Sequence, residues 1–397
     1  MQIGYAASEI TPTLDRPVYL AGFANNRRAT SINDALWVRA LALHDGACTL
    51  VLVAVDVIGI FHNHVRDITT AVQQATHHPT PLHIIISASH THHGPDTMGL
   101  WGPNEKTSGV DFTYLDTLKA QIVECILTAL RQQRPAHSKS AMVQVPGWVK
   151  NTRDRDIVDH TLTLLQCVDP DGTVLATLCN YPCHPEVLWN GNQAITSDYV
   201  HYMRESLQQL TGAPVLFVPG ALGGMLTPDA PAQSFADAQH MGEALAQAAH
   251  TTLTPATATA HTIAVIRRPI SAKLTNPLYK LAFWYKVLPD LRDRHGHIHT
   301  EVNLLKIGGL WFATVPGELF PKLGFRLKAA MQAAGATHTG VIGLANDELG
   351  YILPLEDFSY PWNPFRPGAH YEETNSIGKA ITSAVMQSLQ QMIESTT

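Results

Sequence analysis

One stretch guides the interpretation of the whole chain: Leu82-His-Ile-Ile-Ile-Ser-Ala-Ser-His-Thr-His-His-Gly-Pro95. It begins as an apolar, β-branched run typical of a buried strand, and it ends in three histidines before a Gly-Pro stop. Alternate side chains of an extended segment share a face, so we expect His90 and His92 on one side and His93 on the other. Two imidazoles at the end of a buried strand indicate a metal site or an acid–base pair.

The bulk composition is that of an ordinary globular protein. The chain has 397 residues, of which 45% are hydrophobic and 15% charged, enough to bury a large core. Its formal net charge of −6 disfavours nucleic acid and anionic membranes as partners. No apolar run approaches the roughly 20 residues of a membrane span, and no leader precedes the strand-like start, so we expect a cytoplasmic protein. The oligomeric state stays open, a homo-oligomer included.

Strands and helices alternate along the chain, and polar residues follow several of the strands. Asp45-Gly46, for example, joins two apolar runs in the manner of a hairpin. The predicted strands span residues 2–10, 36–44, 48–58, 82–90, 138–144, 161–168, 174–181, 215–219, 301–307, 310–315 and 341–344, and the predicted helices span 61–76, 111–131 and 239–249 or begin near 198, 319 and 373. We therefore predict one α/β domain over residues 1–397, with a mixed sheet flanked by helices and a functional site at the strand ends.

Three strand ends carry candidate metal ligands. His90 follows the strand described above, His184 follows the strand that ends in Asn180-Tyr181, and Glu318 follows the hairpin ending in Pro316-Gly317. A catalytic zinc typically takes three ligands from His and Glu/Asp and keeps a position for water, whose pKa it lowers to about 7. His92 shares a face with His90 and is placed to act as general acid/base or to hold an oxyanion. The spacing alone leaves structural histidines as the competing interpretation.

Other patterns are weaker candidates for a site. His295, His297 and His299 look like a metal motif, but they lie in a polar turn before a strand. The Gly-rich run Gly220–Gly224 lacks the Lys-Ser/Thr pair of a phosphate loop. The sequence contains no Gly-x-Ser-x-Gly elbow, which disfavours a serine hydrolase.

A series of short motifs, in a fixed order from Glu9 to Glu372, points to a known family. They are Glu9-Ile-Thr-Pro12, Ala21-Gly-Phe23, Val55-Asp56, His90-Thr-His-His-Gly-Pro95, Asn180-Tyr-Pro-Cys-His-Pro185, Ser197-Asp-Tyr199, Pro316-Gly-Glu318, Asn346 with Gly350-Tyr-Ile352, and Tyr371-Glu372. Through these motifs the sequence resembles the catalytic domain of the neutral/alkaline non-lysosomal ceramidases. Each motif is modest by itself, whereas their common order is specific.

This resemblance implies a zinc amidase that cleaves the N-acyl bond of a sphingolipid, and it assigns roles to individual residues. Zinc would be held by His90, His184, Glu318 and Tyr351, with His92, Tyr371 and Arg153 beside the scissile carbonyl, and with Asp56 and Asp198 orienting the ligand imidazoles. Spacing alone does not indicate Tyr351. Ordinary packing in an aromatic loop is the alternative for both tyrosines.

Three departures from the family pattern concern the substrate rather than the metal. His93 replaces the serine of the family and would place a bulky ring beside the site. The segment Phe358–Phe365 is longer and more aromatic than usual, so we predict that Trp362 and Phe365 line the substrate pocket. We expect the C-terminal immunoglobulin-like domain of true ceramidases to be absent.

The expected function is hydrolysis of an N-acyl amide by zinc-bound water, with a lipid or other small-molecule amide as substrate. One alternative keeps the same centre but cleaves a smaller amide, an ester or a lactone. Another is a metal-bearing binding protein without turnover, which the presence of His92 beside the ligands disfavours. An apolar stretch, Leu278–Leu288, is interpreted as a core or contact helix, with a lipid-facing surface as the less favoured interpretation.

Overall fold

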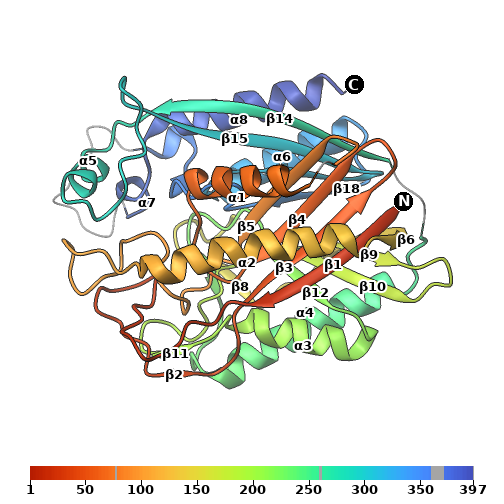
Figure 1. Ribbon diagram of the computed structural model, residues 1–397, viewed down its shortest axis with the longest axis horizontal. Helices are drawn as coiled ribbons and strands as arrows, with labels where there is room; N and C mark the ends of the chain where they lie inside the picture. The colour runs from red at the N-terminus through yellow and green to blue at the C-terminus, as the bar shows by residue number, and fades with distance from the viewer. Residues whose placement is uncertain (77, 259–261, 359–370, 397) are drawn as a thin grey trace.

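The computed structural model describes residues 1–76, 78–258, 262–358 and 371–396, and in these residues three larger sheets carry the core (Figure 1). The first sheet has the order β5-β4-β3-β1-β6, the second β12-β10-β9-β7 and the third β14-β15-β16-β18. Their strands are β1 Gln2–Glu9, β3 Trp37–His44, β4 Thr49–Val55, β5 Leu82–Ala88 and β6 Arg134–Pro135; β7 His137–Gln144, β9 Thr161–Val168, β10 Val174–Tyr181 and β12 Val215–Pro219; and β14 Ile263–Lys273, β15 His297–Ile307, β16 Leu310–Thr314 and β18 His338–Ile342. Each sheet is mixed, because one strand pair in each runs parallel: β4 with β5, β10 with β12 and β16 with β18.

Short two-stranded ladders, eight α-helices and a 3-10 helix at Leu355–Asp357 complete the regular structure of the described residues. The ladders pair β2 Ser31–Ile32 with β11 Ala194–Ile195, β8 Val149–Asn151 with β13 Leu226–Pro228, and β17 Glu318–Leu319 with β19 Tyr351–Ile352. The helices are α1 His62–Ala75, α2 Phe112–Arg131, α3 Tyr199–Thr211, α4 Phe235–Leu253, α5 Pro277–Trp284, α6 Pro321–Ala333, α7 Tyr371–Thr374 and α8 Lys379–Glu394. In Figure 1, α1 and α2 lie across the first sheet, α3 and α4 lie beside the second, and α8 lies along β14 and β15 of the third. No described helix is long and apolar enough to cross a membrane.

Two buried asparagines join the three sheets near the strand ends. The Asn180 amide nitrogen donates to the carbonyl oxygens of Pro219 at 3.0 Å and Val341 at 2.8 Å, which links the second sheet to the third. Asn346 accepts from the Ile86 amide at 2.7 Å through its side-chain oxygen, and its amide nitrogen donates to Glu301 at 2.8 Å, which links the first sheet to the third. These amides satisfy polar groups that would otherwise be buried without partners.

The predicted fold class is confirmed: this is an α/β protein with mixed sheets flanked by helices. The core is divided among several sheets, however, and does not form one continuous sheet. The last helix begins at Lys379, later than predicted, because Gly378 has a φ of 123° and separates it from the short α7. The long strand β14 was not predicted, since most of its residues are exposed or half-buried and Pro269 interrupts its pattern.

A buried ion pair connects the first sheet to α3. Arg204 donates to both carboxylate oxygens of Asp56, at 3.0 and 2.8 Å, and also to the Ser197 hydroxyl at 2.7 Å. Arg204→Ala is expected to lower the free energy of unfolding by about 3–5 kcal/mol, because Asp56 would remain buried without its partner. Chemical denaturation measures this loss. The control is Lys150→Ala, which breaks a half-exposed pair with Asp229 and is expected to cost less than about 1 kcal/mol. An equal effect of the two substitutions would contradict the prediction.

Candidate metal centre

His90 and His184 come from two different sheets and meet beyond the ends of their strands. His90 lies two residues after β5 and His184 three residues after β10. His90 adopts a φ of 67°, a conformation that non-glycine residues rarely take. The centroids of the two rings are 5.1 Å apart, and His92 completes the cluster at 5.0 Å from His90 and 5.4 Å from His184. All three side chains are buried.

Backbone carbonyls fix the orientation of both strand-end imidazoles. Nδ1 of His90 lies 2.6 Å from the carbonyl oxygen of Ile58, and Nδ1 of His184 lies 2.8 Å from that of Leu226. Each ring therefore presents Nδ1 to a backbone carbonyl oxygen and turns Nε2 toward Glu318. A second hydrogen bond that fixes the ligand tautomer is the usual arrangement for a metal-binding histidine.

Glu318 lies between these two nitrogens. One carboxylate oxygen is 3.0 Å from Nε2 of His184, and the other is 3.7 Å from Nε2 of His90. Glu318 belongs to β17, which pairs in parallel with β19 so that Glu318 stands opposite Tyr351. This ladder brings Tyr351 to the cluster, and such a long-range pairing leaves no signal in local sequence patterns.

The electrostatics of the cluster favour a bound cation. Burial lowers the pKa of His90 to about 3, so its imidazole is neutral and able to ligate. Burial also acts to lower the pKa of His184, but the charges of Glu186 and Glu318 overcome this effect and raise it to about 9. Two buried carboxylates thus attract positive charge to the point where the imidazoles converge. With its nitrogen and oxygen donors, this set fits a zinc ion.

His92 faces a carboxylate that the sequence analysis did not identify. Its Nδ1 lies 2.9 Å from a carboxylate oxygen of Glu186, which is an ion-pair distance, and among the described residues neither ring nitrogen of His92 makes a hydrogen bond of regular geometry. Burial acts to raise the pKa of Glu186, but His92 and His184 lower it to about 2, so it is ionised. A glutamate two residues after the strand-end His184 was a signal that could have been used. Gly22 leaves room for the ring, since a Cβ there would lie 2.3 Å from Cγ of His92.

The cluster lies where two cavities meet. The outer cavity, about 780 Å³, is lined by Phe23, Arg153, Trp189 and Met225 among others. The inner cavity, about 60 Å³, is lined by His90, Glu318 and Glu348 together with apolar side chains. Gly22, His92, Tyr351 and Tyr371 line both cavities.

Both tyrosines lie at this junction, and Arg153 lines the outer cavity beside them. The Tyr351 and Tyr371 rings are 5.9 Å apart, and burial raises the pKa of each phenol, so both remain protonated. Arg153 forms an ion pair with Glu372 and donates to the carbonyl oxygen of Asp357. The structure therefore brings together the residues predicted to hold the metal and those predicted to act beside it.

Asp56 and Asp198, which were predicted to orient the ligand imidazoles, form no hydrogen bond or ion pair with His90 or His184 among the described residues. His93, which was predicted to lie beside the site, is buried behind it. Asp56 binds Arg204. The groups that contact Nδ1 of the two imidazoles are the carbonyl oxygens of Ile58, beside His90, and of Leu226, beside His184. Asp198 contacts His93 instead of a predicted ligand, at 3.5 Å from Nε2. His93 is fully buried, and its other nitrogen faces Arg27 at 3.2 Å. The prediction for Trp362 and Phe365 falls outside the described residues.

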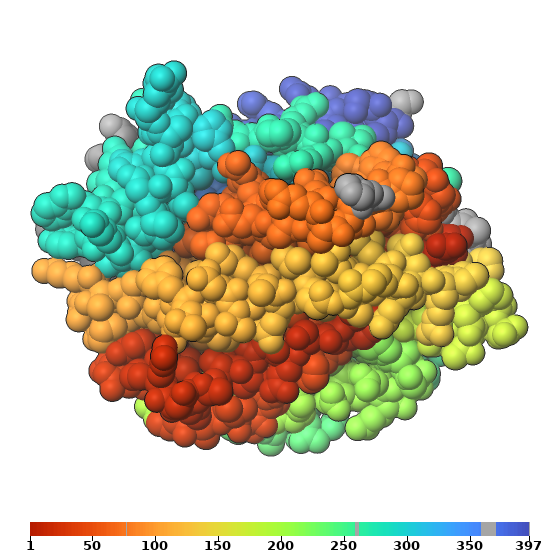
Figure 2. Space-filling model, viewed as in Figure 1, coloured from red at the N-terminus to blue at the C-terminus, as the bar shows by residue number. Residues whose placement is uncertain are grey.

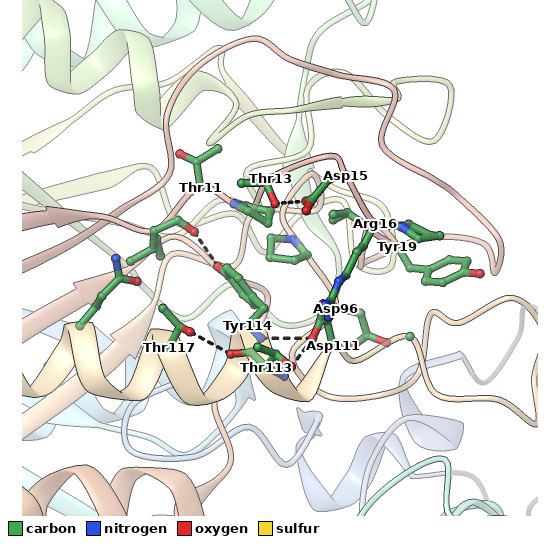
Figure 3. A pocket seen from close by; sticks show the side chains of 17 residues that line it. Thr11, Thr13, Asp15, Arg16, Tyr19, Asp96, Asp111, Thr113, Tyr114 and Thr117 are labelled. Atoms are coloured by element: carbon green, nitrogen blue, oxygen red, sulfur yellow. Dashed lines mark hydrogen bonds and ion pairs between the residues drawn. The ribbon is translucent and has the colours of Figure 1, made fainter.

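The other candidate clusters do not form comparable sites. The exposed His299 pairs with Asp293 at 2.9 Å, whereas the only group whose potential ligand atoms lie within 4.8 Å of one another, among the residues that the structure describes, is His90, His92 and His184. A separate hollow of about 320 Å³ lies beside the N-terminal end of α2 (Figure 3). Its polar groups are engaged locally, as when Asp111 caps α2 and the Tyr114 hydroxyl donates to Ile10.

Substitution of Glu186 tests whether it positions His92. Glu186→Gln is expected to lower kcat at least about tenfold, because the imidazole loses the ionised partner that holds it, while the metal content stays unchanged. Turnover and metal analysis on the same preparation measure both quantities. Glu205→Gln, an exposed change on α3, serves as the control. Full activity of Glu186→Gln would show that His92 does not need this carboxylate.

Solved structures share the fold of this chain. The chain is an α/β protein whose buried imidazole–carboxylate cluster lies at strand ends. Over 99% of its length it matches neutral ceramidase from Pseudomonas aeruginosa, with a TM-score of 0.81 and 17% identity, and covers 74% of that chain. A ceramidase complexed with C2 matches with a TM-score of 0.78 and 16% identity over the same shares of the two chains. The chain therefore has the neutral ceramidase fold, which confirms the expected resemblance at the level of structure.

No protein-family model matches the chain, and no curated protein matches it.

Proposed function

We propose that this protein is a zinc-dependent hydrolase that cleaves an N-acyl amide bond, with an N-acyl sphingoid or a related lipid amide as its substrate. The observation that carries the proposal is the convergence of His90, His184 and Glu318 beside His92 at the junction of two cavities. The ceramidase fold supports amide hydrolysis as the reaction.

His90, His184, Glu318 and Tyr351 would hold the metal. A zinc ion bound there supplies a Lewis acid for the acyl carbonyl and makes hydroxide available near neutral pH. His92 accepts a proton from the attacking water through Nε2 and returns it to the departing amine, while Glu186 stabilises the protonated ring. The Tyr371 hydroxyl donates to the oxygen that becomes negative in the transition state. Arg153 orients the polar part of the substrate at the rim of the outer cavity.

The shape of the outer cavity favours an amphiphilic substrate. Its volume of about 780 Å³ is enough for a chain of several carbons, and Phe23, Trp189 and Met225 give it apolar walls. Each methylene added to the acyl chain should therefore improve kcat/KM, by up to about 0.8 kcal/mol, until the cavity is filled. A substrate series that shows no chain-length dependence would favour a smaller amide, an ester or a lactone.

The decisive experiment is fatty-acid release from a fluorescent N-acyl sphingosine. It is run on the protein as purified, after chelation, and after zinc is restored. Turnover that disappears on chelation and returns with zinc supports the proposal. Protein that carries stoichiometric zinc but releases no fatty acid would overturn the sphingolipid assignment, and absence of turnover on every amide and ester tested would favour a metal-bearing binding protein.

A further inference from the structure

Helix α5 is apolar on two opposite faces, but only one of them is packed against the protein. Phe283 is buried in the core of the third sheet, and Tyr279 lines the inner cavity. On the other side Leu278, Leu281 and Trp284 are 42%, 47% and 74% exposed, and Tyr285 directly after the helix is 40% exposed. A helix that is apolar all round normally lies in a core or against a partner.

These side chains form one patch rather than scattered exposed residues. Leu278, Leu281 and Tyr285 follow one another at intervals of three and four positions, which places them on one side of the helix, with Trp284 beside them. They account for four of the eleven large apolar side chains that are exposed in the described part of the chain. Figure 2 shows this segment projecting at the left-hand edge of the molecule. Contiguous exposed apolar surface of this kind marks a site of contact.

Basic residues surround the patch although the whole chain is acidic. Four basic and two acidic residues lie in the segment 277–294, whereas the chain as a whole has a formal charge of −6. Lys280 and Lys286 are exposed on either side of Trp284. The Lys106 ammonium lies 5.3 Å from the centre of the Tyr285 ring. Tryptophan and tyrosine with flanking lysines are the combination that binds the interface of an anionic lipid layer.

The patch lies beside the candidate metal centre. The Asn276 side chain, which caps α5, donates to the carbonyl oxygens of Thr374 at 2.8 Å and Ser376 at 2.7 Å. These residues close and follow α7, which begins with Tyr371 of the two cavities. A lipid surface in contact with α5 would therefore meet the helix whose Tyr279 lines the inner cavity.

We propose that α5 and Tyr285 form a docking surface for an anionic lipid layer. The aromatic and leucine side chains enter the interfacial region, and the lysines pair with anionic head groups. This proposal is independent of the proposed reaction, because docking requires no turnover. The negative net charge of the whole chain disfavours binding to an anionic membrane. The proposal differs from that expectation because the local charge of α5 is positive.

The test is co-flotation of the full chain with vesicles of phosphatidylcholine alone and of phosphatidylcholine mixed with phosphatidylglycerol. The wild type is expected to bind the mixed vesicles. Trp284→Ser should weaken this binding at least about tenfold, because a large apolar surface no longer leaves water. Lys280→Glu and Lys286→Glu should each weaken it about fivefold or more, with the difference shrinking at high salt. The matched control is Phe112→Ser, which removes an aromatic side chain that is 68% exposed on α2 and should bind as the wild type does.

Two further measurements keep the result unambiguous. The melting temperatures of the variants should equal that of the wild type, since the substituted side chains are exposed. Sedimentation distinguishes a second copy of the chain as the occupant. Failure of the wild type to bind mixed vesicles, unchanged binding of Trp284→Ser, or a dimer that Trp284→Ser dissociates would each overturn the proposal. None of these outcomes bears on hydrolysis, which is measured separately as fatty-acid release from the fluorescent N-acyl sphingosine in the absence of vesicles.

Discussion

Glu318→Gln is expected to remove both the metal and the hydrolytic activity. The substitution keeps the size of the side chain but replaces a carboxylate that approaches two imidazole nitrogens at 3.0 and 3.7 Å. Without this negative charge, His90 and His184 would have to hold a divalent cation chiefly with neutral donors. Loss of a residue that only hydrogen-bonds to a metal ligand typically lowers metal affinity by roughly 10–100-fold. Loss of Glu318, a proposed ligand itself, should lower the affinity for zinc by more than this. Metal analysis after desalting, together with turnover before and after added zinc, measures it.

A control is needed for the burial of Glu318. Glu301→Gln changes another buried glutamate, which pairs with Arg267 in the third sheet. This variant is expected to be less stable but to keep its metal. Stoichiometric zinc in purified Glu318→Gln would remove Glu318 from the set of proposed ligands.

His92→Ala is expected to keep the metal but to have a kcat about 10²–10⁴-fold lower than that of the wild type. This factor is the usual contribution of general acid–base catalysis. The reason is geometric, because Nδ1 of His92 lies 2.9 Å from a carboxylate oxygen of Glu186, and its ring lies 5.0 and 5.4 Å from the rings of His90 and His184. Metal content and single-turnover rate on the same sample separate the two roles that an imidazole can have here.

The contrary outcome is equally informative. If His92→Ala loses its metal, the ligands are the three imidazoles, and the assignment of His92 as acid–base catalyst is wrong. His299→Ala provides the matched control, since this exposed histidine pairs with Asp293 in a turn. Its metal content and turnover should equal those of the wild type.

The fold could be predicted where periodicity and turn residues agree. Asp45-Gly46 marks the β3–β4 hairpin because Gly46 takes a φ of 98° and Asp45 accepts from two backbone amides of the turn. The division into three sheets could not be predicted, because it depends on which strand edges meet in space. Local patterns specify strands but not their partners across the chain.

The same limit applies to the candidate site. His90, His184 and Glu318 were found because each follows a strand, and strand ends are where sites form in α/β proteins. Tyr351 came only from the family resemblance, since its place depends on the β17–β19 ladder. Asp56 binds Arg204, which approaches it from α3, and a carboxylate after a strand gives no indication of such a partner.

The buried amides of Asn180 and Asn346 have a consequence for how the protein assembles. Because they tie the three sheets together, His90 from the first, His184 from the second and Glu318 beyond the third reach their positions only when all three are docked. The loops that must close are long, so this convergence is a late event in folding. A nascent or clipped chain that lacks the third sheet and the segment carrying Glu318 therefore has no complete cluster. If the cluster binds the proposed metal, retention of that metal would report completed folding.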